Sequence, residues 1–69
     1  MDSPTLILID ALKNKGLQWE RIILLTAGLS HPGASLDMAE WIIMNPNADW
    51  EEMMKEKTRL IKIYQFAQT

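Results

Sequence analysis

Apolar residues recur along the chain at helical spacing, and glycine or proline interrupts the runs that they form. Spacings of three and four residues place side chains on one face of a helix, so the pattern predicts amphipathic helices. The interruptions divide the chain into four of them, over residues 4–15, 18–27, 36–44 and 49–67. The expected fold class is all-α: a small four-helix domain over residues 1–69 with a longer C-terminal helix.

Each interruption carries a local signal that begins or ends a helix. Ser3-Pro4 supplies a cap and a preset first turn. Gly16 and Gly28 each follow a predicted helix, where glycine supplies the left-handed residue of a C-terminal cap. Ser35 is the expected N-cap of the third helix. Asn45-Pro46 ends that helix, because the residue before proline avoids the helical region.

The fourth predicted helix has the most regular pattern. Asp49 and Glu52 have the spacing of a capping box, with Asn47 as a competing cap. Acidic residues crowd its first turns and basic residues its later turns, which matches the helix dipole. The stripe expected to be buried consists of Trp50, Met53, Met54, Lys57, Leu60, Ile61, Tyr64 and Ala67.

The apolar pattern also predicts a core. The second helix is apolar nearly all round, so we expect it to be the central helix, covered on several sides. The three tryptophans are expected to act as large apolar anchors. Largely buried side chains are expected at Trp19, Ile22, Leu25, Leu36, Trp41, Trp50 and Ile61.

Composition and charge narrow the class of protein. The chain has 69 residues, of which 48% are hydrophobic, and this indicates one folded domain. The formal charge is -2, and acidic residues offset the basic ones within the same segments, which argues against a nucleic-acid surface. The chain has no cysteine and no apolar run long enough to span a membrane. We therefore expect a soluble, cytoplasmic protein.

No motif for catalysis or metal binding is present in the sequence. His31 is the only histidine, and no second ligand stands at a fixed spacing from it. No nucleophile, base and orienting group can be named together. The chain is therefore expected not to be an enzyme, and to use no metal, no cofactor and no small-molecule substrate.

Three short motifs carry a resemblance to a known family: Lys15-Gly16-Leu17, Thr26-Ala27-Gly28, and Met38-Ala39-Glu40-Trp41-Ile42-Ile43. On them, residues 12–46 resemble a ubiquitin-associated domain, a small three-helix interaction module. The resemblance implies a three-helix bundle, with the fourth helix added to it. It also implies a partner-binding patch at the loop after the first helix and the end of the third, formed by Gly16, Leu17, Ile42 and Ile43. Asn45-Pro46-Asn47-Ala48 is similar to a segment of small uncharacterised helical proteins of Gram-positive bacteria.

Two functions follow as hypotheses. The first is a non-catalytic interaction module that binds a protein partner, or a second copy of itself, through an apolar helical patch. It is favoured by the surplus of large apolar residues in so short a chain. The alternative is a helix-turn-helix regulator that uses residues 18–27 and 36–44 as its helix pair. Against it, the predicted connection is long, and the second helix of the pair contains Asp37 and Glu40 but no Arg or Lys.

Overall fold

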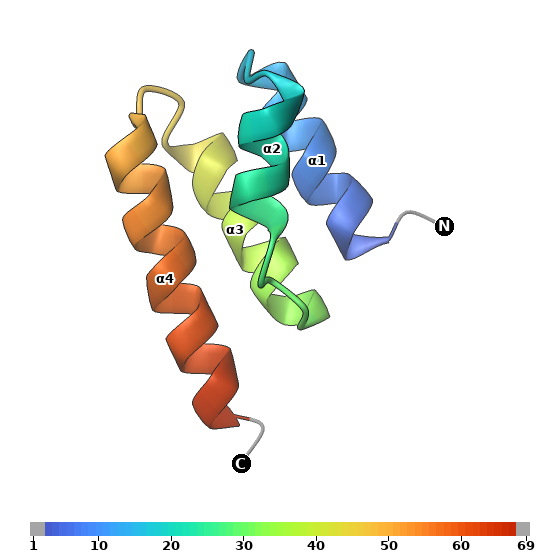
Figure 1. The fold of residues 1–69 in the computed structure, drawn as a ribbon, viewed down its shortest axis with the longest axis vertical. Coiled ribbons are helices and arrows are strands. Elements are labelled where there is room, and N and C mark those ends of the chain that lie inside the picture. Colours follow the sequence, from blue (N-terminus) through green and yellow to red (C-terminus); the bar gives the residue numbers. More distant parts are fainter. Residues whose placement is uncertain (1–2, 68–69) are drawn as a thin grey trace.

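A computed structural model of the chain describes residues 3–67, which form four helices and no strand (Figure 1). The helices are α1 (Pro4–Asn14), α2 (Trp19–Thr26), α3 (Pro32–Met44) and α4 (Trp50–Ala67). The all-α prediction is confirmed, and three of the four predicted helices agree with the structure to within one residue at each end. The third helix begins four residues earlier than predicted.

The start of α3 corrects the prediction that Ser35 is its N-cap. His31 is the N-cap: its Nδ1 accepts a hydrogen bond from the backbone N–H of Gly33 at 2.9 Å, and Pro32 occupies the first turn. This is the same combination of a capping acceptor and proline that opens α1. Ser35 is instead buried inside the helix, where its hydroxyl donates to the carbonyl of Leu29 at 3.2 Å.

The two glycine signals are confirmed, and each produces its own kind of turn. Gly16 has a φ of 93°, and the N–H of Leu17 donates to the carbonyl of Leu12 at 3.3 Å, which is the long bond of a Schellman motif. Gly28, with a φ of 86°, takes the third position of a type II turn over residues 26–29. Both turns need a positive φ, which glycine adopts without steric cost.

The capping box predicted for α4 is present. The N–H of Glu52 donates to Asp49 Oδ1 at 2.9 Å, and the N–H of Asp49 donates to Glu52 Oε1 at 3.1 Å. Two backbone donors that have no partner inside the helix are satisfied by this exchange. Asp49, not Asn47, therefore caps the helix.

The central helix is α3, not α2, which corrects the expectation from the apolar pattern. In Figure 1, α1 and α4 lie on opposite sides of α3, and α2 packs against α1 and α4. Five side chains of α3 are buried but only two of α2. Leu24 of α2 is 54% exposed, because one side of that helix faces solvent. The apolar core consists of Leu8, Ala11, Leu12, Ile22, Leu25, Leu29, Ala34, Met38, Ala39, Ile42, Met53 and Leu60.

The predicted core is correct in part. Ile22 and Leu25 are buried, and Trp41, Trp50 and Ile61 are half-buried against the core. The prediction that Trp19 is buried is wrong: its side chain is 54% exposed at the start of α2, with the Lys13 ammonium 5.8 Å from its ring centroid. The prediction for Leu36 is also wrong, because its side chain lies on the exposed face of α3.

The predicted stripe on α4 faces the bundle as expected. Met53 and Leu60 are buried, and Trp50, Met54, Lys57, Ile61 and Tyr64 are half-buried. The side chain of Ala67 lies outside the part that the structure describes. None of the helices within residues 3–67 is both long enough and apolar enough to cross a membrane.

Candidate functional site

A hollow with a volume of about 570 Å³ lies between α1 and α3. We call it the α1–α3 groove. Its apolar lining comes from Ile7 and Ala11 of α1, from Ile42 and Ile43 of α3, and from Pro46; its polar lining is Asp10, Asn14 and Lys15.

Helical spacing explains how the two walls form. Ile7, Ala11 and Asn14 stand at spacings of four and three residues, so they share the side of α1 that faces the groove. On α3, Ile42 is buried and forms part of the core beneath the groove. Its neighbour Ile43 is 67% exposed, so its side chain stands at the rim. The wall that α3 contributes to the groove is therefore apolar.

One hydrogen bond joins the two walls at the end of the groove. The ammonium of Lys15, just after α1, donates to the backbone carbonyl of Pro46, just after α3, at 2.7 Å. Pro46 lies two residues beyond Met44, the last residue of α3, so its carbonyl belongs to the connecting loop. This bond between residues 31 positions apart in the sequence holds the loop after α1 beside the end of α3.

The four residues of the expected binding patch fall into two pairs. Ile42 and Ile43 line the α1–α3 groove. Gly16 and Leu17 do not line it, although they directly follow Lys15, which does. Gly16 is exposed in the turn, and Leu17 packs against the core.

Sequence reasoning missed the wall that α1 contributes. Ile7, Asp10, Ala11 and Asn14 form that wall, and none of them was predicted as a binding residue. Their spacing was visible in the sequence, but it does not tell which other helix packs beside α1. The packing of α1 against α3 is part of the tertiary structure, and the periodicity of a single helix does not predict it.

A polar cluster lies where α4 meets the start of α3. The hydroxyl of Tyr64 donates to Asp37 Oδ2 at 2.5 Å, and the Tyr64 ring lies 4.6 Å from the His31 ring, centroid to centroid. The hydrogen bond to Asp37, with a smaller contribution from desolvation, raises the pKa of Tyr64 above its ordinary value of 10.0. This cluster fastens α4 to α3.

Lys57 makes a similar connection between α4 and α2. Its ammonium donates to the carbonyl of Leu24 at 2.5 Å, close to the C-terminal end of α2. Partial burial lowers the pKa of Lys57 below its ordinary value of 10.5. Unlike Lys15, which bonds a loop carbonyl, Lys57 satisfies a carbonyl in the last turn of another helix.

No group of three or more His, Cys, Asp or Glu side chains within residues 3–67 could hold a metal ion. Every buried side-chain nitrogen or oxygen atom in this part of the chain has a hydrogen-bond partner. The feature that stands out is the α1–α3 groove.

Comparison with known proteins adds no relative. At a significant level the chain matches no protein-family model, no curated protein and no solved structure.

Proposed function

We propose that the protein is a small non-catalytic interaction module that binds a helical segment of another protein in the α1–α3 groove. The observation that carries the proposal is a groove with an apolar lining, whose rim residue Ile43 is 67% exposed. Amphipathic helices commonly bind by laying their apolar face into such a groove. A cytoplasmic location is part of the proposal and is supported by the lack of cysteine.

A second exposed apolar side chain on the face of α3 that carries Ile43 supports this function. Leu36 stands seven residues before Ile43, two helical turns away on the same face, and is 43% exposed. Contiguous apolar surface is a common mark of an interaction site, whereas single exposed apolar residues are ordinary.

The resemblance to ubiquitin-associated domains supports the same location. It implies a patch at the loop after α1 and the end of α3, which are the two segments that the Lys15 bond to Pro46 holds together. We carry over the position of this patch and the three-helix topology, and we do not carry over ubiquitin as the ligand. Lys15 stands where the family motif has methionine.

The alternative, a DNA-binding helix pair, has less support. The connection between α2 and α3 is shorter than predicted, since it spans residues 27–31. However, a recognition helix must enter the major groove, and α3 has α1 on one side and α4 on the other. Its exposed residues include Asp37 and Glu40, which phosphates would repel, and it contains no Arg or Lys.

A photo-crosslinking experiment tests the proposed function. The photoreactive amino acid benzoylphenylalanine is placed at Ile43 and, as a control, at Leu24, an exposed apolar residue on α2. Both proteins are irradiated in cells that produce the chain naturally. We expect a discrete crosslinked product from position 43 and none from position 24. Equal products from both positions, or none from position 43, would show that the groove is not the binding surface.

A further inference from the structure

We propose that α4 is a hinged lid, which moves away from the bundle as one helix while α1, α2 and α3 stay folded. The inference goes beyond the proposed function, since it concerns the contact of α4 with the other helices and not the α1–α3 groove. It rests on how the core is distributed, how the C-terminal half of α4 is supported, and where the chain before α4 is held.

Nearly all of the apolar core belongs to the first three helices and the turn between α2 and α3. Its members other than Met53 and Leu60 lie between Leu8 and Ile42. With 18 residues α4 is the longest helix, yet only those two of its described side chains are buried, whereas the 13-residue α3 buries five. An element with few buried apolar side chains opens at a lower free energy than the core does. Loss of α4 would therefore remove two members of the core and leave the others together.

The C-terminal half of α4 rests on backbone more than on side chains. Beyond Leu60 no described residue of α4 is buried. A Cβ atom at Gly28 would lie 3.3 Å from Ile61 Cδ1, and one at Gly33 would lie 2.7 Å from Tyr64 Cε1. A hollow of about 230 Å³ remains between these two sides of the interface. Glycine has no side chain to contact and a hollow forfeits contacts, so the apolar attraction in this half of the interface is small.

Solvent-exposed polar contacts do much of the fastening. Lys57 donates to the carbonyl of Leu24 on α2, and Tyr64 donates to Asp37 on α3. When such a bond opens, its donor and acceptor bond to water instead, so the net free energy of the bond is small. The lowered pKa of Lys57 indicates that its ammonium gives up hydration in the closed state. These bonds fix the position of α4 when it is closed without making its release costly.

The interactions that stabilise α4 as a helix lie within its own segment. The capping box joins Asp49 and Glu52, and Arg59 pairs with Glu56 at 2.6 Å. Isolated helices become marginal below about 12–15 residues, and α4 is longer than that. The helix can therefore leave the bundle without first losing these interactions.

The loop before α4 is held to the other helices almost to its end. Lys15 bonds the carbonyl of Pro46 at 2.7 Å, and the N–H of Ala48 donates to the carbonyl of Asn45 at 3.0 Å. The pivot is therefore the short segment between Ala48 and Trp50. Figure 1 shows this connection at the end of α4 opposite to the C-terminus, so a rotation there moves the whole helix.

Opening uncovers one side of α3. Ala34, Asp37 and Trp41 stand at spacings of three and four residues and lie against α4. Asp37 bonds Tyr64, and the other two share hollows with α4 residues. The bundle thus contains a surface, apolar at Ala34 and Trp41, that is accessible only in the open state.

The test uses single introduced thiols, because the chain contains no cysteine of its own. Met53→Cys places a thiol on the inner face of α4, and its matched control Leu12→Cys places one in the core of α1; both native side chains are fully buried. Circular dichroism verifies that each protein is folded, and urea unfolding gives its global unfolding constant. If one of them does not fold, Leu60→Cys and Leu8→Cys replace the pair.

The rate of reaction with a thiol reagent under native conditions is divided by the unfolding constant of each protein. We expect Met53→Cys to react at least about tenfold faster than Leu12→Cys on this scale. Opening of α4 exposes the first thiol, whereas the second becomes accessible only when α1–α3 unfold.

A substitution that weakens α1 separates opening from global unfolding. The hydroxyl of Ser3 caps α1 by accepting from the N–H of Leu6 at 3.1 Å. This cap is present in the closed and the open state but not in the unfolded chain. Ser3→Ala should therefore accelerate the uncorrected reaction of Leu12→Cys about fivefold and leave that of Met53→Cys unchanged. Tyr64→Phe removes a bond made only in the closed state, so it should accelerate both reactions about fivefold.

Two results would overturn the inference. One is an equal corrected rate for Met53→Cys and Leu12→Cys. The other is an effect of Ser3→Ala that is the same for both thiols, since α4 would then leave only when the whole domain unfolds. Neither result decides the function proposed for the α1–α3 groove, which is tested by the crosslink from position 43.

Discussion

Replacing Gly33 by alanine sets two effects of opposite sign against each other. Gly33 lies in the first turn of α3, where alanine has a higher helix propensity by up to about 1 kcal/mol. However, a Cβ atom at this position would lie 2.7 Å from Cε1 and 2.9 Å from the hydroxyl oxygen of Tyr64. Ordinary contacts between carbon atoms are about 3.5–4.0 Å, so the ring would have to move by about 1 Å.

The steric effect should prevail in the wild-type background. Overpacking a fitted site typically costs about 1–3 kcal/mol, which exceeds the gain in helix propensity. The Tyr64 ring cannot move away freely, because its hydroxyl is bonded to Asp37 and its ring contacts His31. We expect Gly33→Ala to lower the free energy of unfolding by about 1 kcal/mol, which lowers the melting temperature by about 4–8 °C in a domain of this size.

The assay is a double-mutant cycle with Tyr64→Ala, followed by thermal and urea unfolding. Without the ring, only helix propensity remains, so Gly33→Ala should become stabilising by up to about 1 kcal/mol. The reversal of sign is the decisive readout. A Gly33→Ala protein as stable as the wild type, or a substitution with the same effect in both backgrounds, would refute the reasoning.

Three further predictions concern the core, the cap and the tyrosine. Leu12→Ala should lower the free energy of unfolding by about 2–5 kcal/mol, because Leu12 is fully buried, whereas Leu24→Ala at the surface should change it far less; urea unfolding compares the two. His31→Ala should cost about 0.5–2 kcal/mol through the lost cap of α3, and His31→Asn should restore most of it in the same assay; equal losses would exclude the cap as the cause. The raised pKa of Tyr64 means that its contribution to stability is fully present below about pH 10 and is lost as the pH rises through the folded-state pKa. Between pH 8 and pH 11 the melting temperature should therefore fall more steeply for the wild type than for Tyr64→Phe. The lowered pKa of Lys57 affects both proteins equally, so it cancels in this comparison. Melting temperatures that fall in parallel would contradict the prediction.

Sequence reasoning succeeded where one short segment determines the local structure. The capping box of Asp49 and Glu52 and the left-handed turns at Gly16 and Gly28 depend only on neighbouring residues, and all are present. It failed at the start of α3, where Ser35 was the expected N-cap and His31, four residues earlier, caps the helix instead. His31 and Pro32 begin the helix, and the hydroxyl of Ser35 donates to the carbonyl of Leu29 instead.

Sequence reasoning was weaker wherever the answer depends on which helices pack together. The apolar residues of α2 surround the helix, so their pattern does not show that Leu24 faces solvent or that α3 is central. Only part of the candidate site was predicted. Ile42 and Ile43 line the groove as expected, but the wall that α1 contributes depends on the packing of α1 beside α3. Met38 is buried for the same reason: it lies on α3, which has other helices packed on both sides.

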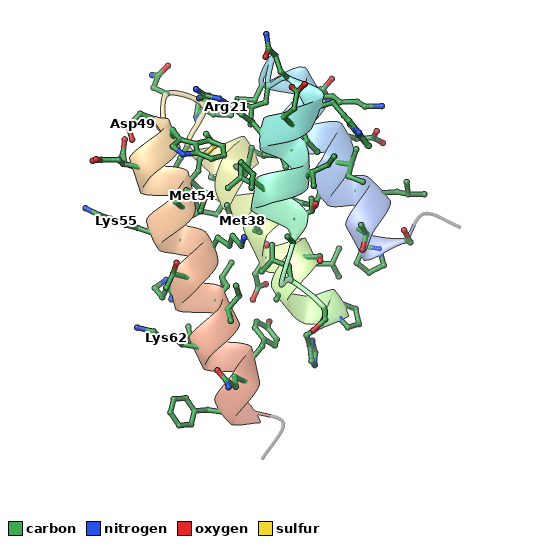
Figure 2. The ribbon with its side chains drawn as sticks, in the orientation of Figure 1. Arg21, Met38, Asp49, Met54, Lys55 and Lys62 are labelled. Carbon is green, nitrogen blue, oxygen red and sulfur yellow. The ribbon has the colours of Figure 1, made fainter. Side chains whose placement is uncertain are left out.

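The methionines of this protein should differ in how readily they are oxidised, because some are exposed and others are buried. Met38 and Met53 are sealed in the core, as Figure 2 illustrates for Met38, whereas Met44 is 71% exposed at the C-terminal end of α3. A peroxide should convert Met44 to its sulfoxide in the native state and reach Met38 only when the bundle opens. The sulfoxide would place a polar group on the surface of the bundle while the core stays intact. Oxidation would then mark the exposed methionine before it damages the fold, and a sulfoxide reductase could reverse the change.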